Sequence, residues 1–427
     1  MTVEQLEQRV KCLSWNNEGT NLAVGLTHGF IIYSTELLLS EEGWLSEVIR
    51  RPVLGGVSIV ALHGQGNLVV LVGWDSGHRD TVTILDLSAD DTVNEDLSVL
   101  ARVKLSSVVY AVCFHPRMLL VGIQTGLIYL FDHALQMIES FQASTPASTS
   151  RQKGDTLALG TMLVEKMACG ICYSQLYGVI LGPTTGTVRC ICYASERHVQ
   201  SSLLQEPFSD LGKKLTPQLT VNVVEVHRNE VGCITITPDG VRALTVSERG
   251  TSVKLLDVEN HVVICQFSRG TTPNAVHALG LLVSSTETIA ACISGAGTFH
   301  LFHIRTADTL DARAVGVANT DPWASGHSFM RAWTDYRNSV CPKTRLVIPE
   351  DELYDTLCRE EDCGKSIYSM VLRHAAKKDS CVALVVQRCM SPQGITRKAR
   401  LLSVQVELSA KDSMKILRSF YFPRDEL

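Results

Sequence analysis

The chain has 427 residues, of which 39 are lysine or arginine and 44 are aspartate or glutamate. Its formal net charge of −5 and isoelectric point near 6.2 argue against a chain-wide nucleic-acid surface, because nucleic-acid-binding domains concentrate positive charge. Apolar residues make up 45% of the chain, which excludes a wholly disordered protein and provides for a sizeable core.

The N-terminal segment and the cysteines indicate a compartment. Residues 1–15 contain early acidic residues and lack the apolar stretch of a secretory signal. We expect no membrane-spanning helix, because no run reaches about 18 uninterrupted apolar residues. Most of the 14 cysteines lie within apolar, strand-like runs, which is typical of reduced core thiols. These features predict a cytoplasmic protein.

One unit recurs along the chain: short, β-branched, alternating strands that end at glycine, asparagine, aspartate or proline. Six copies lie at 10–34, 57–87, 107–132, 162–194, 230–258 and 275–304, and the fourth is the weakest. A seventh copy is expected from strands near 381–389 and 399–408. In the six copies the third strand begins near Gly29, Thr81, Gly126, Gly186, Gly250 and Gly297. A four-stranded propeller blade of about 40–45 residues with loop insertions matches this repeat.

The repeat predicts an all-β fold, a seven-bladed WD40-like β-propeller that forms a single domain over residues 1–427. The expected blades are 9–34, 55–88, 99–141, 160–202, 217–267, 274–304 and 366–420. A flexible loop is expected at 143–160, and a long insertion follows the third strand of blade six at 305–345. A two-sheet sandwich is the competing fold, although it rarely holds some 25 strands. Long helical patterns are absent, which argues against an α/β sheet.

Residues 226–282 resemble a known family. This run contains Ser-Glu-Arg-Gly-Thr at 247–251 and Phe-Ser-Arg-Gly-Thr at 267–271. It resembles the PROPPIN family, seven-bladed WD-type propellers that bind phosphoinositides and act in autophagy. The opening LSWNNEGTNLAVGLTHGFIIY is similar to the family's first blade, and NLVVLVGW with TVTILDL is similar to its second. The resemblance covers about residues 10–304.

The family motif is Phe-Arg-Arg-Gly, and each arginine serves one head-group pocket. Here Ser268 replaces the first arginine and Arg269 retains the second. The resemblance implies a second pocket formed by Arg269, Gly270, Thr271, Thr272, Ser294, Thr298 and His300. It implies a weakened first pocket formed by His227, Ser247, Thr251, Lys254 and Ser268. The turn at Ser294 departs from the family pattern, because it is one residue shorter than the family's usual turn.

Arginine suits a phosphate monoester because its planar guanidinium offers two parallel donors. The alternative for Arg269 is an ordinary surface arginine in a loop between blades. His227 either lines the first pocket or bonds across its blade, and a phosphate contact would make binding stronger as pH falls toward about 6.5. His277 lies within an apolar run and is expected in the core.

The insertion at 305–345 is rich in aromatic and basic residues. Its candidate membrane contacts are Trp323, Phe329, Arg331, Trp333 and Arg337. Aromatic rings interleaved with cations suit an anionic membrane interface, and the family's loop at this position inserts into membranes. The alternative is a loop that packs its aromatic rings against the side of the propeller.

Metal and catalytic sites are not predicted. Cys169 and Cys172 form a CxxC pair, and Cys190 and Cys192 follow, but all four fall within alternating strand runs. Core thiols are therefore favoured over a zinc site, which needs two such pairs on tight turns. We find no nucleophile elbow and no acid–base pair, so we expect no catalytic residue, no cofactor and no enzyme.

The predicted function is that of a phosphoinositide-binding propeller in autophagosome formation, specific for phosphatidylinositol 3-phosphate, the 3,5-bisphosphate, or both. The resemblance implies lipid-transfer and lipidation-machinery proteins as partners, and no nucleic acid. It also implies a cytoplasmic protein that associates peripherally with phagophore, endosomal or vacuolar/lysosomal membranes. The alternative is a WD-repeat scaffold for protein–protein assembly with reduced or lost lipid binding, which Ser268 favours.

Overall fold

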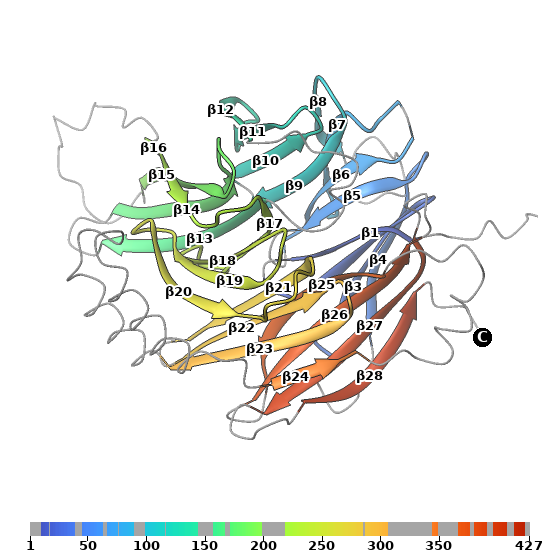
Figure 1. The fold of residues 1–427 in the computed structure, drawn as a ribbon. Helices are drawn as coiled ribbons and strands as arrows, with labels where there is room; N and C mark the ends of the chain where they lie inside the picture. The colour runs from blue at the N-terminus through green and yellow to red at the C-terminus, as the bar shows by residue number, and fades with distance from the viewer. Residues whose placement is uncertain are drawn as a thin grey trace, which may run out of the picture.

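The protein folds into a ring of small β-sheets (Figure 1). The computed structural model describes residues 10–16, 18–38, 45–62, 66–75, 77–88, 99–115, 117–143, 157–166, 171–198, 218–284, 287–305, 344–348, 366–375, 380–390, 396–407 and 414–422. These residues form seven sheets of four antiparallel strands each, and every sheet uses four consecutive strands. The predicted seven-bladed β-propeller is confirmed, and the sandwich is excluded.

The strands of each blade follow in chain order. Blade one contains β1 (Val10–Trp15), β2 (Asn21–Leu26), β3 (Gly29–Ser34) and β4 (Ser46–Pro52). Blade two contains β5 (Val57–Leu62), β6 (Leu68–Gly73), β7 (Thr81–Asp86) and β8 (Val99–Lys104). Blade three contains β9 (Val109–His115), β10 (Met118–Ile123), β11 (Leu127–Asp132) and β12 (Met137–Gln142). Blade four contains β13 (Leu157–Lys166), β14 (Ile171–Leu181), β15 (Thr187–His198) and β16 (Gln218–Glu225).

The last three blades are built in the same way. Blade five contains β17 (Val231–Ile236), β18 (Arg242–Ser247), β19 (Ser252–Asp257) and β20 (Val262–Ser268). Blade six contains β21 (Val276–Val283), β22 (Glu287–Ser294), β23 (Thr298–Arg305) and β24 (Thr344–Val347). Blade seven contains β25 (Ser366–His374), β26 (Ser380–Met390), β27 (Thr396–Glu407) and β28 (Met414–Phe422). The predicted long insertion of blade six thus lies between its third and fourth strands.

Burial differs between the inner and outer strands of a blade. All six residues of β10 are buried, whereas β8 at an outer edge alternates between half-buried and exposed residues. Inner strands are covered on both faces by neighbouring blades, so their sequences are continuously apolar. Outer strands keep only one face covered. This difference explains why the sequence repeat shows three clear strands while the fourth strand of each blade is weaker.

The hydrophobic core is divided into layers between neighbouring blades. At the interface of blades five and six, for example, Val253 and Phe267 pack in one cluster with Phe302. The ring centroids of Phe267 and Phe302 are 5.0 Å apart. This layer fixes the end of β20, from which the chain crosses to blade six.

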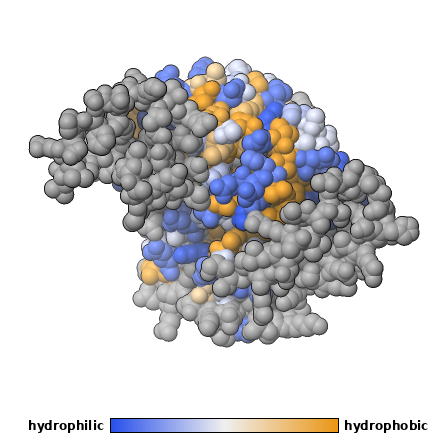
Figure 2. Space-filling view, turned by 90° about the vertical axis from the view of Figure 1, so that its left-hand side faces the viewer, coloured by the Kyte–Doolittle hydropathy of each residue, from blue (hydrophilic) through white to orange (hydrophobic). Residues whose placement is uncertain are grey.

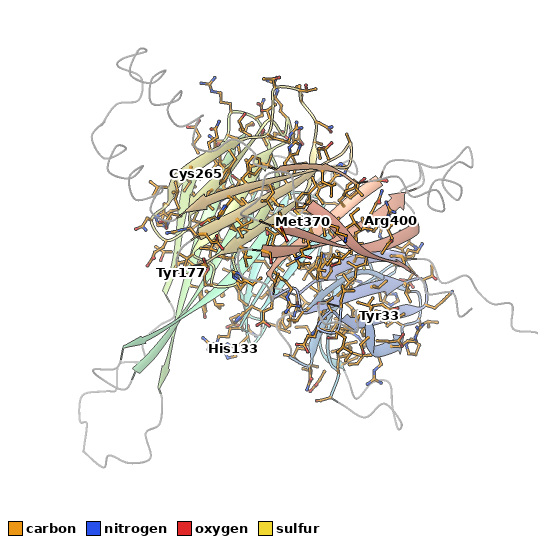
Figure 3. All side chains as sticks on the ribbon, turned by 90° about the horizontal axis from the view of Figure 1, so that it is seen from below. Tyr33, His133, Tyr177, Cys265, Met370 and Arg400 are labelled. Atoms are coloured by element: carbon orange, nitrogen blue, oxygen red, sulfur yellow. The ribbon has the colours of Figure 1, made fainter. Side chains whose placement is uncertain are left out.

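Blade four departs from the expected boundaries. Its first strand begins at Leu157, so the end of the predicted loop 143–160 is strand, and residues 144–156 lie outside the described part. Strands β13, β14 and β15 contain 10, 11 and 12 residues. They project beyond the ring (Figure 3). The weak fourth copy of the sequence repeat therefore corresponds to a blade with long strands, matched only by β26 and β27 of blade seven among the described strands.

The ring closes where blade seven meets blade one, the blue and red strands in Figure 1. Leu22 and Leu384 belong to the same apolar cluster at this seam. Arg373 Nη1 donates a hydrogen bond to Thr35 Oγ1 at 3.3 Å. Because each sheet uses only consecutive strands, side-chain packing closes the ring and no strand is shared. Within the described residues, no helix is long and apolar enough to cross a membrane.

Candidate functional site

The loop at 269–275 joins the outermost strand of blade five, β20, to the innermost strand of blade six, β21. Hydrogen bonds from its backbone tie both ends to the turn between β18 and β19. The Arg269 amide donates to the Thr251 carbonyl at 2.9 Å, and the Asn274 amide donates to the Arg249 carbonyl at 3.0 Å. The loop is therefore a fixed crossing between two blades.

The side chain of Arg269 fastens the same loop from within. Its Nε donates to the Gly250 carbonyl, and its Nη2 donates to the Thr272 carbonyl at 2.6 Å. A longer contact of 3.4 Å joins Nη2 to the Asn274 carbonyl. The guanidinium is thus half-buried directly beside the four exposed residues of the loop, Gly270 to Pro273. Arg269 is therefore an arginine of the loop between blades whose guanidinium is bonded to backbone carbonyls.

The turn that faces the loop requires glycine. Gly250 has a φ of +64°, and a side chain there would meet the Asn274 carbonyl. L-residues other than glycine rarely adopt this conformation. Gly250 therefore lets the β18–β19 turn approach closely enough for its carbonyl to accept the Arg269 bond.

The predicted first pocket lies on blade five. Ser247 ends β18 and Ser268 ends β20, where Ser268 is paired with Ser252 of β19. His227 Nε2 lies 3.1 Å from Thr245 Oγ1, and both side chains are buried. Burial lowers the pKa of His227 to about 4, with a further contribution from the nearby positive charge of Lys254. His227 is therefore a neutral, buried histidine that bonds across its blade.

Lys254 supplies a cation to this cluster. It lies on β19, opposite Thr245 of β18. Its pKa is lowered chiefly by burial, while the charge of Glu225 raises it and that of Arg228 lowers it. The first cluster therefore contains a half-buried lysine whose charge is partly balanced by an acid. Sequence reasoning included Lys254 but missed Thr245, which resembles an ordinary strand threonine.

The predicted second pocket combines the loop with the turn between β22 and β23. Ser294 ends β22, Thr298 begins β23, and His300 follows on β23. All three side chains are buried. The Ser294 hydroxyl has no hydrogen-bond partner among the described residues. A buried hydroxyl without a partner is costly, so Ser294 could donate to or accept from a polar group that approaches this turn.

Asn274 connects the loop to this turn. A Cβ atom added to Gly295 would lie 3.2 Å from Asn274 Oδ1 and 3.2 Å from His277 Nε2, so both side chains lie close to the Gly295 backbone. His277 is buried, as its apolar run predicts. Arg269 also affects blade six, because its charge lowers the pKa of the Cys292 thiol, although burial raises that pKa overall, to about 12. The loop and the β22–β23 turn are thus in contact, and the Gly295 amide donates to the Ala275 carbonyl at 2.8 Å.

Blade seven contains a row of hydrogen-bonded side chains that the sequence did not suggest. Gln387 Nε2 donates to Tyr368 Oη at 3.3 Å, and Arg400 Nε donates to Gln387 Oε1 at 2.8 Å. All three residues are buried, and Figure 3 labels Arg400 in this blade. Tyr368 Oη would lie 2.8 Å from a Cβ atom added to Gly297, so the hydroxyl lies close to the backbone of this turn. This row of hydrogen-bonded side chains therefore lies beside the turn that holds Ser294 and Thr298.

Other predicted features contribute no further site. Cys190 is buried and burial raises its pKa to about 12. No cluster of metal-ligating side chains occurs in the described part of the chain. The predicted membrane contacts Trp323, Phe329, Arg331, Trp333 and Arg337 lie outside the described residues. Figure 2 shows one side of the propeller, where hydrophobic and hydrophilic side chains are interspersed.

Comparisons with curated proteins point to autophagy proteins. No protein-family model matches the chain. Autophagy-related protein 18 of Phaeosphaeria nodorum is 21% identical over 317 residues, which cover 74% of this chain and 68% of the relative. Autophagy-related protein 21 of Pichia angusta is 20% identical over 313 residues, covering 73% and 70%. Autophagy-related protein 18 of Aspergillus oryzae is 32% identical over 84 residues, 20% of each chain.

Solved structures share the fold over nearly the whole chain. Kluyveromyces lactis Hsv2 is 12% identical with a TM-score of 0.58, and the match covers 98% of this chain and 100% of that one. A complex described as KlAtg21 with the coiled-coil of AgAtg16 gives a TM-score of 0.55 at 13% identity, covering 97% and 99%.

Proposed function

We propose that the chain is a propeller of the PROPPIN type that binds phosphoinositides and recruits autophagy machinery to membranes, because its curated relatives and its fold both support this assignment. Its relatives are named as autophagy-related proteins, which supports a role in autophagy for this propeller. The proposed ligand is the head group of phosphatidylinositol 3-phosphate, the 3,5-bisphosphate, or both. The proposed location is the cytoplasmic surface of phagophore, endosomal or vacuolar membranes.

The observation that carries this proposal is the position of Arg269 beside the exposed residues 270–273. Its Nη2 donates to the Thr272 carbonyl at 2.6 Å, so the guanidinium already lies at the loop that would meet a head group. A phosphate oxygen is a stronger, charged acceptor than a backbone carbonyl. The unpartnered Ser294 hydroxyl and the exposed Thr271 and Thr272 would serve the remaining phosphate oxygens.

The first cluster is proposed as the weaker of the two sites. It lacks an arginine at 268, and His227 is neutral near pH 7 because its pKa is about 4. Lys254 would supply the positive charge, but only as a point charge. Its charge is partly balanced by Glu225. One head group per chain is therefore the expected stoichiometry.

The insertion at 305–345 is proposed as the second membrane contact. Trp323, Phe329 and Trp333 would enter the lipid, and Arg331 and Arg337 would meet anionic head groups. One weak signal gives only marginal, reversible membrane binding. The head-group site and this loop would therefore act together.

Vesicle flotation with and without phosphatidylinositol 3-phosphate tests the proposal. Arg269→Ala should weaken binding to the phosphoinositide vesicles roughly ten- to hundredfold, the effect of losing one bidentate charge-assisted contact. Arg102→Ala, an equal charge change at an exposed site on β8, should leave binding unchanged. Because Arg269 also fastens the loop, thermal melting of each variant is needed. Arg269→Lys should retain the charge while recovering only part of the binding.

The second candidate is a scaffold for protein assembly, and Ser268 in place of an arginine favours it. The solved complex of KlAtg21 with the coiled-coil of AgAtg16 is a protein–protein assembly of a propeller with the same fold. The proposed partners of this chain are accordingly proteins of the lipid-transfer and lipidation machinery. A folded chain that does not float with any phosphoinositide vesicle would decide for the scaffold.

A further inference from the structure

Two threonines in the described part of the chain are followed by proline, Thr237 and Thr272. Their environments are opposite. Thr237 is only 3% exposed, its hydroxyl donates to Asp239 and lies 3.0 Å from the Arg242 carbonyl, and the Arg242 amide donates back to it at 3.1 Å. Thr272 is exposed in the loop between blades five and six. Of these two described threonines, Thr272 is the one whose Thr-Pro dipeptide is accessible to another protein.

The local backbone suits recognition by a protein kinase. Pro273 biases Thr272 toward an extended conformation, in which a segment is bound most readily by a partner. A Cβ atom added to Gly270 would have no other atom within 4 Å, so this side of the loop borders open space. The loop ends are fixed by the amides of Arg269 and Asn274. An accessible Thr-Pro is therefore displayed on a fixed loop.

The charges around Thr272 suit a phosphate once it is attached. Arg269 Nη2 lies 2.6 Å from the Thr272 carbonyl oxygen, so the guanidinium already contacts the residue that would be modified. Arg249 is exposed on the adjoining turn, whose carbonyl accepts the Asn274 amide. Glu248, also exposed on that turn, opposes them. Two guanidinium groups therefore outnumber one carboxylate.

We propose that Thr272 is a phosphorylation site for a proline-directed protein kinase, and that its phosphate pairs with Arg269 and releases the chain from phosphoinositide membranes. This inference rests on the proposed function. The kinase transfers the γ-phosphoryl group of ATP to Thr272 Oγ1. The new O–P bond forms as the bond to the bridging oxygen of ADP breaks, and the hydroxyl proton passes to the kinase.

Competition follows from the chemistry of the two phosphates. Phosphothreonine and a 3-phosphorylated inositol are both phosphate monoesters with close to two negative charges near pH 7. The phosphothreonine is part of the same loop as Arg269, so its effective concentration at the guanidinium is far above that of a head group in solution. The modified residue therefore acts as a tethered competitor for the same cation.

The experiment treats the full chain with a purified proline-directed kinase and Mg·ATP. Mass spectrometry should find phosphate on Thr272 and none on Thr237. Flotation with phosphatidylinositol 3-phosphate vesicles should then fall at least about tenfold, the effect of losing one charge-assisted contact. Pro273→Ala removes the kinase motif and leaves Thr272 in place. This control should stay unmodified at Thr272 and float equally well with and without kinase treatment, even if the kinase modifies Thr-Pro or Ser-Pro motifs elsewhere in the chain.

A phosphorus-31 NMR titration reads the pairing without any lipid. The second ionisation of phosphothreonine ordinarily has a pKa of about 6. Pairing with Arg269 should lower it in the modified chain, and Arg269→Ala should return it to the ordinary value. An unshifted pKa in the modified chain would overturn the pairing.

The vesicle outcomes are distinguishable. Equal flotation of the modified and unmodified chains overturns this inference alone. If neither form binds vesicles, the proposed function is wrong and membrane release by phosphorylation is wrong with it. Failure of the kinase to modify Thr272 also overturns the inference.

Discussion

Arg269 bonds to carbonyls of two different segments, the β18–β19 turn and its own loop. The Arg269 side chain therefore holds the loop in place and also gives it a positive charge. The sequence predicted the positive charge from the neighbouring motif. It did not predict the backbone bonds, because these depend on the close approach of the Gly250 turn, which joins segments about twenty residues apart. The structural and binding roles of Arg269 are therefore coupled.

Substituting Ser268 by arginine is expected to increase head-group binding. Ser268 is half-buried at the end of β20, beside the first cluster. Ser268→Arg should restore a planar cation there and raise the number of soluble head groups bound per chain from about one to about two, because each pocket then holds a guanidinium. Isothermal titration calorimetry with a short-chain phosphoinositide measures this stoichiometry. Ser268→Gln, a long side chain without charge, is the matched control. A stoichiometry of two for the unmodified chain would show that Lys254 already completes the first pocket.

His227 sets a pH dependence of stability. Its pKa in the folded protein is about 4, against an ordinary value of 6.5, so unfolded chains bind a proton that folded chains exclude. Stability from this residue is complete above pH 6.5 and is lost as pH falls from 6.5 toward 4. The full effect is on the order of 3 kcal/mol.

Urea unfolding at several pH values should therefore show a decline below about pH 6.5 that is smaller in His227→Gln. Head-group binding, in contrast, should not respond to His227 between about pH 8 and pH 6.5, because the residue stays neutral throughout that range. The expectation that a phosphate-contacting His227 strengthens binding toward pH 6.5 does not fit a pKa this low. Identical pH profiles of the two chains would contradict the low pKa.

The turn around Gly250 is the element on which the loop rests. Gly250→Ala forces a side chain into the left-handed region and against the Asn274 carbonyl. We expect a loss of about 1–3 kcal/mol in unfolding free energy together with weaker vesicle binding. Gly270→Ala is a useful comparison, since its φ is also positive but its side-chain position is open. If the two variants melt at the same temperature, the close approach of the turn has no energetic importance.

At the scale of elements, inner strands were predictable and register was not. The predicted starts of the third strands at Gly29 and Thr81 coincide with β3 and β7, because glycine, polar turns and apolar runs are local signals. Tyr368, Gln387 and Arg400 lie on three strands of the seventh repeat. Only the register of these strands places the three side chains next to one another. A one-residue shift would separate them. Local sequence patterns do not fix register to one residue, so the row of side chains beside the Ser294 turn could not be foreseen.

The whole molecule depends on every blade being covered by two neighbours. Removing blade seven by truncating the chain after residue 365 should expose the apolar faces of blades six and one, which now pack on it. We expect such a chain to lack cooperative thermal unfolding and to aggregate. Differential scanning calorimetry against the full chain measures this. A truncated chain that melts cooperatively at the same temperature would show that the ring is not one cooperative unit.

The seam between blades seven and one has a consequence for synthesis. Since each blade uses consecutive strands, each can pair its own backbone as soon as it leaves the ribosome, and no early strand must wait for a late partner. Only the packing of blade one on blade seven spans the full chain, and such distant contacts form slowly. Until the last sixty or so residues are made, the apolar face of blade one remains open. That interval is when the nascent chain most needs a chaperone.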